Sequence, residues 1–420
     1  MSEVLSMSVL SSEPTTIVAD FQQFLMYLKV HPVKLTKAKG NLAKKDLRAL
    51  YEILPNLGLE VSESSNQDYY PVMKLFIELG QKLELIRKVA SGASTVLVID
   101  EEQLALFEKL TMTERYVSLL QCFWLHADWE VLAGGLYAST PTNVYFLFES
   151  LSGLPVNKKI NIANDRDLKY ALHDYGHFLL YFQYFGFWEV ELEPDLEKKT
   201  RVIAKSIQIQ PLLKSLMSIL AESFEQRADS NNFGMLDFLF GGFEGEDDED
   251  FEDEDEAIST EDFVAALKPL FENGQLEQVL TAKEKAMKRG EYIFKVAISE
   301  SCWRTIAMHD SNTLHDLHEW IQRAFDFDDD HLYAFYMDSK PFSRNCYNSP
   351  MDATGPFAHK VTIAELYLEE GQQFLYLFDF GDEWHFRVVV EKINEGVEAL
   401  LPGIRKEKGK APKQYPDLDW

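Results

Sequence analysis

The chain has 420 residues, a formal net charge of -28 at pH 7, 46% hydrophobic residues and 13% aromatic residues. This length suits about two to four domains, and the apolar content excludes a wholly disordered chain. The strong acidity argues against extensive wrapping of nucleic acid or of an anionic membrane, although a local basic patch can still bind either.

The N-terminal region is predicted to hold three helices followed by a β-ribbon. Residues 1–15 are rich in serine and form a flexible tail, and apolar spacing then predicts helices over residues 21–30, 43–53 and 72–80. Strand-like runs follow at residues 83–89 and 95–99, and further helices at 101–110 and 113–128. Three helices and a ribbon are typical of a winged helix, so we predict a winged-helix-like helical domain over residues 16–155.

Clustered cations surround the turn before the second of these helices and continue into it. Such a cluster near a helix N-terminus can contact phosphates, so duplex DNA is one predicted partner of this domain. The alternative is that the same residues form a solvated helix face. The cluster consists of Lys34, Lys37, Lys39, Lys44, Lys45 and Arg48.

A similar order of helices followed by two strands, which we call a cycle, comes next and predicts a second winged-helix-like unit over residues 156–240. It comprises a helix over residues 165–183, strands over 187–192 and 200–208, and a helix that begins at Pro211. The tip between the strands, at residues 193–199, is acidic, so we expect no DNA contact there. His173 and His177 are four residues apart, but a third ligand is missing and we predict no metal site.

A strongly acidic run separates these units from the rest of the chain. Residues 241–260 contain glycines and then an almost unbroken series of Asp and Glu, which repel one another and favour an extended linker. Residues 244–256 also suggest a basic protein partner, although most such runs are only solvated linkers. We predict a helical connector over residues 261–290, with helices at 261–271 and 276–289.

The pattern changes to strands in a predicted α+β domain over residues 291–420. We expect a strand at residues 292–299, a helix at 313–325, a strand at 331–337 and a short helix at 361–368. A β-hairpin over residues 374–390 turns at Gly381-Asp382-Glu383. The predicted fold is therefore multidomain, with a mainly α N-terminal half and a C-terminal α+β domain whose sheet is mostly antiparallel.

Polar residues around this hairpin form a candidate catalytic or ligand-binding site. Carboxylates and imidazoles that converge can bind a metal or transfer protons. The alternative is that the carboxylates satisfy turn amides and the histidines fill polar gaps in the core. The candidates are Arg304, His318, Asp379, Asp382, Glu383 and His385. Asp379-Phe380-Gly381 copies a kinase tripeptide, but the other kinase motifs are missing, so we reject a kinase.

Several rare residues in this domain recur in the order of a known family. Residues 291–392 resemble the plasmid pRi-type ORF-three-like family, whose members are also labelled insertion-element passenger TnpR proteins. That resemblance implies a mobile-element-associated protein, and the family has no established activity to transfer to this chain. The matching residues are Trp303-Arg304, Leu314-His-Asp-Leu-His318, Ile321-Gln322, Phe325, His331-Leu332, Phe335 and the run from Tyr376 to His385.

The remaining features favour a cytoplasmic protein without a cofactor. Cys122, Cys302 and Cys346 are too few and too scattered for a disulfide framework or a cysteine-based zinc site. We find no secretory signal and no apolar run long enough to span a membrane. We predict a non-enzymatic nucleic-acid-associated or adaptor protein. The alternative is an enzyme, or a small-ligand or metal binder, that uses the C-terminal hairpin site.

Overall fold

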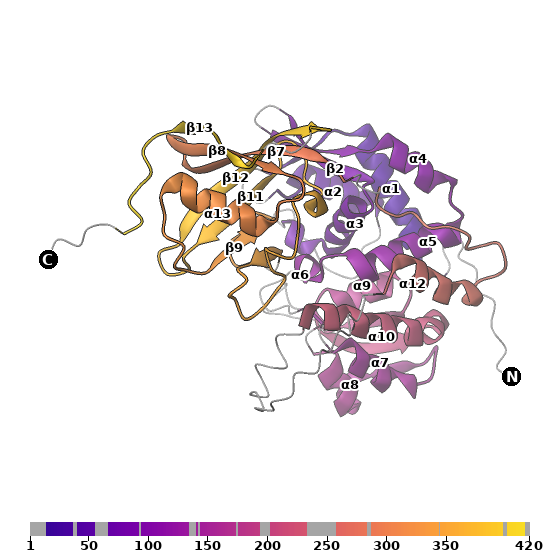
Figure 1. Cartoon of the computed structure of the whole chain (residues 1–420). Coiled ribbons are helices and arrows are strands. Elements are labelled where there is room, and N and C mark those ends of the chain that lie inside the picture. The colour runs from indigo at the N-terminus through magenta and orange to yellow at the C-terminus, as the bar shows by residue number, and fades with distance from the viewer. Residues whose placement is uncertain are drawn as a thin grey trace, which may run out of the picture. The chain divides into compact units, whose positions relative to one another are not determined.

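The computed structural model describes residues 14–36, 40–54, 66–91, 94–133, 140–141, 143–173, 175–193, 202–232, 258–283, 287–343, 345–397 and 401–415. The chain forms two compact units, Met1–Lys283 and Glu284–Trp420 (Figure 1). The first is mainly helical and the second contains a seven-stranded antiparallel sheet, which confirms the predicted fold class. The finer domain boundaries within the first unit stay a prediction, and residues 241–257 of the predicted linker lie outside the described residues.

The first unit begins with the predicted order of three helices and a ribbon. Its small sheet has the strand order β1-β3-β2, with both strand pairs antiparallel. Apolar residues at helical spacing turn each helix toward a shared core, for example Phe21, Phe24 and Leu28 on α1. The elements are α1 (Ile17–Val30), β1 (Val33–Leu35), α2 (Lys44–Ile53), η1 (Gln67–Tyr69), α3 (Pro71–Lys82), β2 (Ile86–Ser91) and β3 (Ser94–Ile99).

Helices α4 (Glu101–Lys109), α5 (Met112–Gln121) and α6 (Trp129–Leu132) follow. Thr111 and Glu114 form a capping box, so α5 begins earlier than the predicted residue 113. The predicted helix to residue 128 instead widens into one π-helical turn, η2 (Cys122–His126). That turn places Phe123 and Trp124 in the core.

The second cycle repeats the arrangement of the first, with the strand order β4-β6-β5. The predicted single helix over residues 165–183 is wrong, because the chain turns between two shorter helices where Gly176 has a left-handed φ of 49°. The elements are α7 (Val144–Ser152), β4 (Lys159–Asn161), η3 (Ile162–Asn164), α8 (Arg166–Ala171), α9 (Phe178–Tyr184), β5 (Trp188–Leu192) and β6 (Ala204–Ile209). Most of the predicted tip, from residue 194, lies outside the described residues.

The last part of the first unit packs back onto α5. It holds α10 (Pro211–Asn232), α12 (Thr260–Leu267) and η4 (Lys268–Leu270). The predicted helix over residues 276–289 is wrong for the described part of that range, which has no regular structure. Side chains of α5 bind its backbone instead: Ser118 Oγ accepts from the Leu280 amide at 2.8 Å, and Glu114 Oε1 accepts from the Glu277 amide at 3.1 Å.

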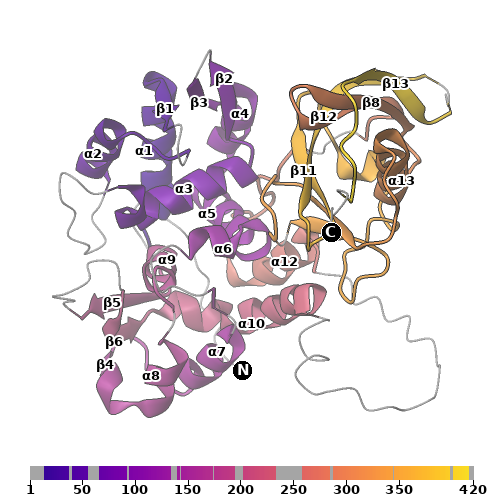
Figure 2. The ribbon, with the colours of Figure 1, turned by 90° about the vertical axis from the view of Figure 1, so that its left-hand side faces the viewer.

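Helices α3 and α9, the third helical segments of their two cycles, lie inside one hydrophobic core. Helix α3 contacts α9 and α6 (Figure 2). The Phe76 ring lies 5.2 Å from the Phe21 ring and 5.6 Å from the Tyr184 ring, centroid to centroid. Every residue of α9 except Gln183 is buried. Both helices therefore pack within the unit and leave little surface for another molecule.

The second unit is a curved antiparallel sheet with α13 on one face (Figure 1). Thr313 and Asp316 form a capping box at the start of α13. The strand order is β10-β9-β11-β12-β7-β8-β13. The elements are β7 (Gly290–Ser299), β8 (Cys302–His309), α13 (Leu314–Phe325), β9 (Tyr333–Tyr336), β10 (Cys346–Asn348), η5 (Ala364–Leu366), β11 (Gln373–Phe378), β12 (Trp384–Glu395) and β13 (Gly403–Lys408).

Four elements of this unit differ from the prediction. The predicted helix over residues 361–368 shortens to the single turn η5, and strands β8, β10 and β13 were not expected. Alternate residues of β7 and β12, among them Phe294, Val296 and Val388, face α13 and form the core. Within the described ranges, no helix combines the length and the apolar run that crossing a bilayer requires.

Candidate functional site

The hairpin turn between β11 and β12 is held by Asp379. This residue has a left-handed φ of 56°, and its Oδ1 accepts hydrogen bonds from the amides of Gly381 at 2.8 Å and Asp382 at 3.3 Å. Its carbonyl oxygen accepts from the Glu383 amide at 2.7 Å. These bonds give Asp379 the turn-stabilising role that the sequence offered as the alternative to catalysis.

The candidate histidines lie on opposite faces of the sheet. In the hairpin register, Leu377 pairs with His385, and the neighbouring Tyr376 pairs with Phe386. Tyr376 points toward α13, where it meets His318, so His385 points away from α13. The hypothesised convergence of His318 with His385 therefore does not form.

His318 lies in a buried network with two tyrosines. Gln322 Nε2 donates to the Tyr376 hydroxyl oxygen at 2.7 Å, so the tyrosine O–H is left to donate to His318 Nδ1, also at 2.7 Å. The His318 ring stacks on Tyr333 with 3.8 Å between centroids. This pattern places the proton of neutral His318 on Nε2, which is 3.0 Å from Asp329 Oδ1 but not aligned for a hydrogen bond.

Burial of His318 makes the stability of the second unit depend on pH. Removal of the imidazole from water lowers its pKa from 6.5 to about 4, despite the opposing charge of Asp329. The unfolded chain binds this proton more readily than the folded chain. The free energy of unfolding should therefore fall by about 3 kcal/mol as the pH drops from about 6.5 to about 4.

Urea unfolding at both ends of this pH range measures the effect. His318→Gln should show a smaller decrease than the wild type, and His385→Gln, which alters an exposed imidazole, should behave as the wild type does. The comparison between variants is needed because burial also lowers the pKa of His177 in the first unit to about 4. Equal pH dependence in His318→Gln and the wild type would contradict the assignment.

Arg304 connects α13 to strand β13 through hydrogen bonds. Its Nε donates to the Ala324 carbonyl at 2.9 Å, and its Nη1 donates to the carbonyls of Lys408 and Gly409, both at 3.1 Å. The guanidinium also lies 4.8 Å from the centre of the Phe325 ring, and the side chain is buried. These carbonyls and the Phe325 ring are the partners of the guanidinium. Arg304 is therefore a structural residue and not a member of a hairpin site.

The remaining hairpin candidates are exposed and weakly paired. Glu383 Oε2 lies 3.7 Å from His385 Nε2, and the Asp382 side chain is exposed. Asp379 Oδ2 faces His331 Nε2 at 3.5 Å. Solvent screens such pairs, so they contribute little to stability. Among the described residues, no group of His, Cys, Asp and Glu has an arrangement that could hold a metal ion.

Residues that the sequence did not mark as candidates contact the side chains of His318 and Asp379. Tyr376, Tyr333 and Asp329 surround His318, and His331 faces Asp379. The run Asp328-Asp-Asp-His331 was the available signal, because acids beside a histidine often mark a polar site. The tyrosines gave no signal, since buried aromatic residues are usual in strands.

In the first unit, the described members of the predicted basic cluster lie on β1 and α2. Lys34, Lys44, Lys45 and Arg48 are exposed. Lys37 and Lys39 lie outside the described residues. The nearby Asp46 is buried and accepts from the Tyr27 hydroxyl at 2.9 Å, so it turns away from the cations.

The N-terminus of α2 has an unusual composition. Its N-cap, Ala43, supplies no side-chain hydrogen bond, and Lys44 and Lys45 follow at once. Cations are unfavourable at a helix N-terminus, where the amides carry positive partial charge. A bound anion would relieve this repulsion, so the composition is consistent with phosphate contact.

His173 and His177 do not share a helical face. The turn between α8 and α9 separates them, and His177 is buried at the N-cap of α9. Its Nδ1 has no hydrogen-bond partner in the structure. The helical spacing on which a metal site would depend is therefore absent.

Comparison with known proteins identifies relatives of the second unit. Residues 292–414 match the family described as plasmid pRiA4b ORF-3-like protein, which confirms the predicted resemblance. The uncharacterized protein y4hQ of Sinorhizobium fredii is 29% identical over 108 residues, which are 25% of this chain and 53% of that relative. The chain thus spans about half the length of this curated relative.

A solved protein of unknown function from Methanosarcina mazei Go1 is 27% identical, with a TM-score of 0.26 over 30% of this chain and 72% of that chain. These relatives are described as uncharacterized or of unknown function, so they assign no activity. The family match begins at residue 292, and the winged-helix prediction for the N-terminal half is not confirmed by it.

Proposed function

We propose that this chain is a non-enzymatic, nucleic-acid-associated protein whose first unit contacts duplex phosphates without reading the base sequence. The observation that carries this proposal is that the first cycle exposes cations on β1 and α2 but buries its third helix, α3. Lys34, Lys44, Lys45 and Arg48 are exposed on β1 and α2, whereas α3 is buried.

The order of elements supports a winged-helix-like origin for both cycles. Each has three helical segments, a short strand after the first helix, and a final pair of strands, and each sheet places its last strand in the middle. A winged helix normally reads bases with its third helix in the major groove. Here α3 and α9 pack within one core, which argues against base readout by either cycle.

Cations on β1 and α2 can still bind the phosphate backbone. Such contacts give affinity without sequence preference, and they weaken steeply with added salt. The net charge of -28 repels nucleic acid at long range, so binding depends on the local cation–phosphate contacts, which are strongest at low salt. A mobile-element protein with this property would act as an adaptor on DNA and not as a recombinase.

The alternative, an enzyme or ligand binder at the hairpin, has weaker support. His318 and His385 are on opposite faces, and Arg304 is occupied by backbone carbonyls. A basic protein partner for residues 244–256 remains a proposal that rests on charge alone, because that segment lies outside the described residues.

Fluorescence anisotropy of the full chain with labelled duplexes of about 20 base pairs, at about 50 mM salt, tests the proposal. Two unrelated duplex sequences should bind equally well. The double variant Lys44→Glu/Lys45→Glu should bind at least about tenfold more weakly, since each cation that no longer neutralises a phosphate removes counterion release.

The matched control is Arg166→Glu/Lys169→Glu on α8, the corresponding helix of the second cycle, where both side chains are exposed. It makes the same change in charge and should leave duplex binding unchanged. The proposal fails if the wild type shows no binding at low salt, or if both double variants weaken binding equally.

A further inference from the structure

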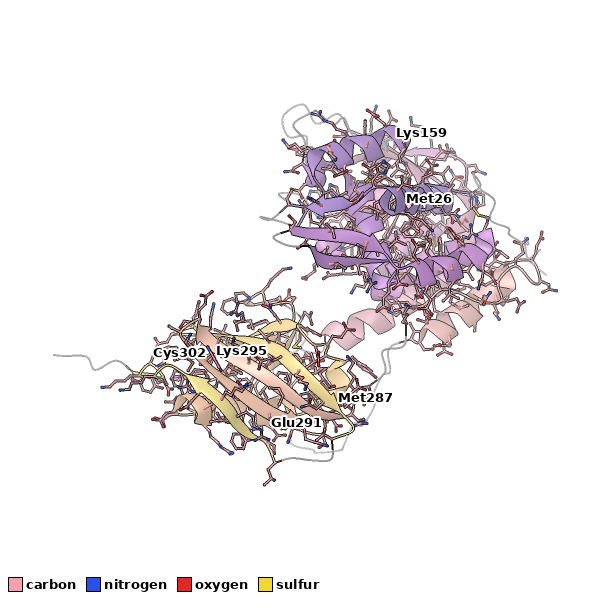
Figure 3. All side chains as sticks on the ribbon, turned by 90° about the horizontal axis from the view of Figure 1, so that it is seen from above. Met26, Lys159, Met287, Glu291, Lys295 and Cys302 are labelled. Atoms are coloured by element: carbon pink, nitrogen blue, oxygen red, sulfur yellow. The ribbon has the colours of Figure 1, made fainter. Side chains whose placement is uncertain are left out.

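The sheet of the second unit has one face that α13 does not cover, which we call the open face. Strand register identifies its side chains. Thr305 on β8 pairs with Lys295 on β7 and with Lys406 on β13, and Trp303 pairs with Ala297 and Lys408. Residues between these, such as Ile306 and Phe294, belong to the core on the α13 side. Figure 3 shows these strands side by side, with Lys295 labelled.

The open face is basic although the chain is strongly acidic. Within the part of the chain that the structure describes, no carboxylate lies within ion-pair distance of any of its protruding cations. Two acids nearby are used elsewhere or point elsewhere: Glu291 binds Arg405 at 3.3 Å, and Glu407 alternates to the other side near Arg304. Glu391 lies in the bulge beside Lys392. The protruding cations are Lys295, Arg387, Lys392, Lys406 and Lys408.

A buried hydroxyl without a partner lies among these cations. Thr305 is 2% exposed, and its Oγ1 has no hydrogen-bond partner in the structure. Its cross-strand neighbours, Lys295 and Lys406, lie about 5 Å away on either side. A buried unsatisfied hydroxyl is costly, and a phosphate oxygen held between two ammonium groups would satisfy it.

An aromatic ring adjoins this position. Trp303 is partly exposed, and the Lys295 ammonium lies 4.9 Å from the centre of its ring. Ile293 and Val389, both partly exposed, add apolar area on the same face. Cations that follow a backbone and an aromatic side chain that stacks on a base are the two components of single-strand binding.

We propose that the open face binds single-stranded nucleic acid, with phosphates on Lys295, Lys406 and Lys408 and a base on Trp303. A sheet of seven strands is about 30 Å wide, whereas the major groove of a duplex is about 12 Å wide, so this face cannot enter the groove. A single strand has no such restriction, because its bases can turn toward the sheet. This site is separate from the cations on α2 and does not depend on them.

Fluorescence anisotropy of the full chain with a labelled oligothymidylate of about 20 nucleotides tests this inference. Lys406→Glu/Lys408→Glu should weaken binding at least about tenfold, and the slope of log affinity against log salt should become less steep by about 0.7 for each phosphate that is no longer neutralised. Trp303→Ala should weaken binding by about fivefold or more with the salt slope unchanged, since stacking carries no charge.

The matched control is Arg323→Glu/Lys360→Glu, which changes the charge equally at exposed positions in the α13 layer. It should retain wild-type affinity for the oligothymidylate. Circular dichroism confirms that each variant is folded before its affinity is used.

Three results would overturn the inference. One is the absence of oligothymidylate binding by the wild type at low salt. Another is an equal decrease in affinity for the open-face and control variants. The third is full competition of a polyglutamate peptide with the oligothymidylate, together with weaker binding of that peptide to Lys406→Glu/Lys408→Glu and unchanged binding to Trp303→Ala. This result would identify the face as a docking site for an acidic protein. Weaker duplex binding by the α2 variant bears only on the first unit.

Discussion

Replacement of Arg304 by alanine is expected to lower the free energy of unfolding of the second unit by about 3–5 kcal/mol. The side chain is buried and donates to the carbonyls of Ala324, Lys408 and Gly409. Alanine would leave these acceptors without their donor; the bond to the Ala324 carbonyl is buried, and those to Lys408 and Gly409 are part-buried. The guanidinium also covers the Phe325 ring, so alanine would remove that cation–π interaction together with the hydrogen bonds.

Urea unfolding of the full chain, with hydrogen exchange to assign the destabilisation to the second unit, measures this effect. Arg323→Ala is the control, because that arginine is on the same helix but exposed, with an ion pair to Glu319 at 3.1 Å. It should cost about 0.5 kcal/mol or less. Similar decreases in the two variants would show that the buried hydrogen bonds of Arg304 contribute little.

Replacement of Phe76 by alanine should destabilise both cycles of the first unit together, by about 3–5 kcal/mol. Phe76 lies on α3, and its ring contacts Phe21 and Phe24 of α1 as well as Tyr184 of α9. It is completely buried, so truncation leaves a cavity between the two cycles. The proposed function depends on this arrangement, because it is what removes α3 from the surface.

Hydrogen exchange of the full chain tests this coupling. In Phe76→Ala, amides of α9 should exchange faster along with those of α3, whereas Leu106→Ala, at a position 45% exposed on α4, should leave both helices protected. Faster exchange in α3 with unchanged exchange in α9 would mean that the two cycles fold separately. In that case α3 could become accessible, and base readout would need to be reconsidered.

The sequence predicted those parts of the candidate site that depend on neighbours along the chain. The hairpin and the turn role offered for Asp379 both follow from short-range chemistry, and the structure contains each of them. The break between α8 and α9 was missed, because apolar spacing over residues 165–183 continues through the turn at Gly176. Periodicity alone does not detect a helix that stops and restarts in nearly the same phase.

By itself, the sequence determined the fold class, the order of most elements and the resemblance of the second unit to a known family. Those features depend on local propensity, on apolar period and on rare residues in a fixed order. Only the tertiary structure decided which side chains meet. His318 and His385 separate because strand pleating sends neighbours in the hairpin to opposite faces, and Lys295 and Lys406 flank Thr305 because β8 pairs with both β7 and β13. The relative positions of these side chains depend on pairing between segments distant in the sequence, which no local pattern encodes.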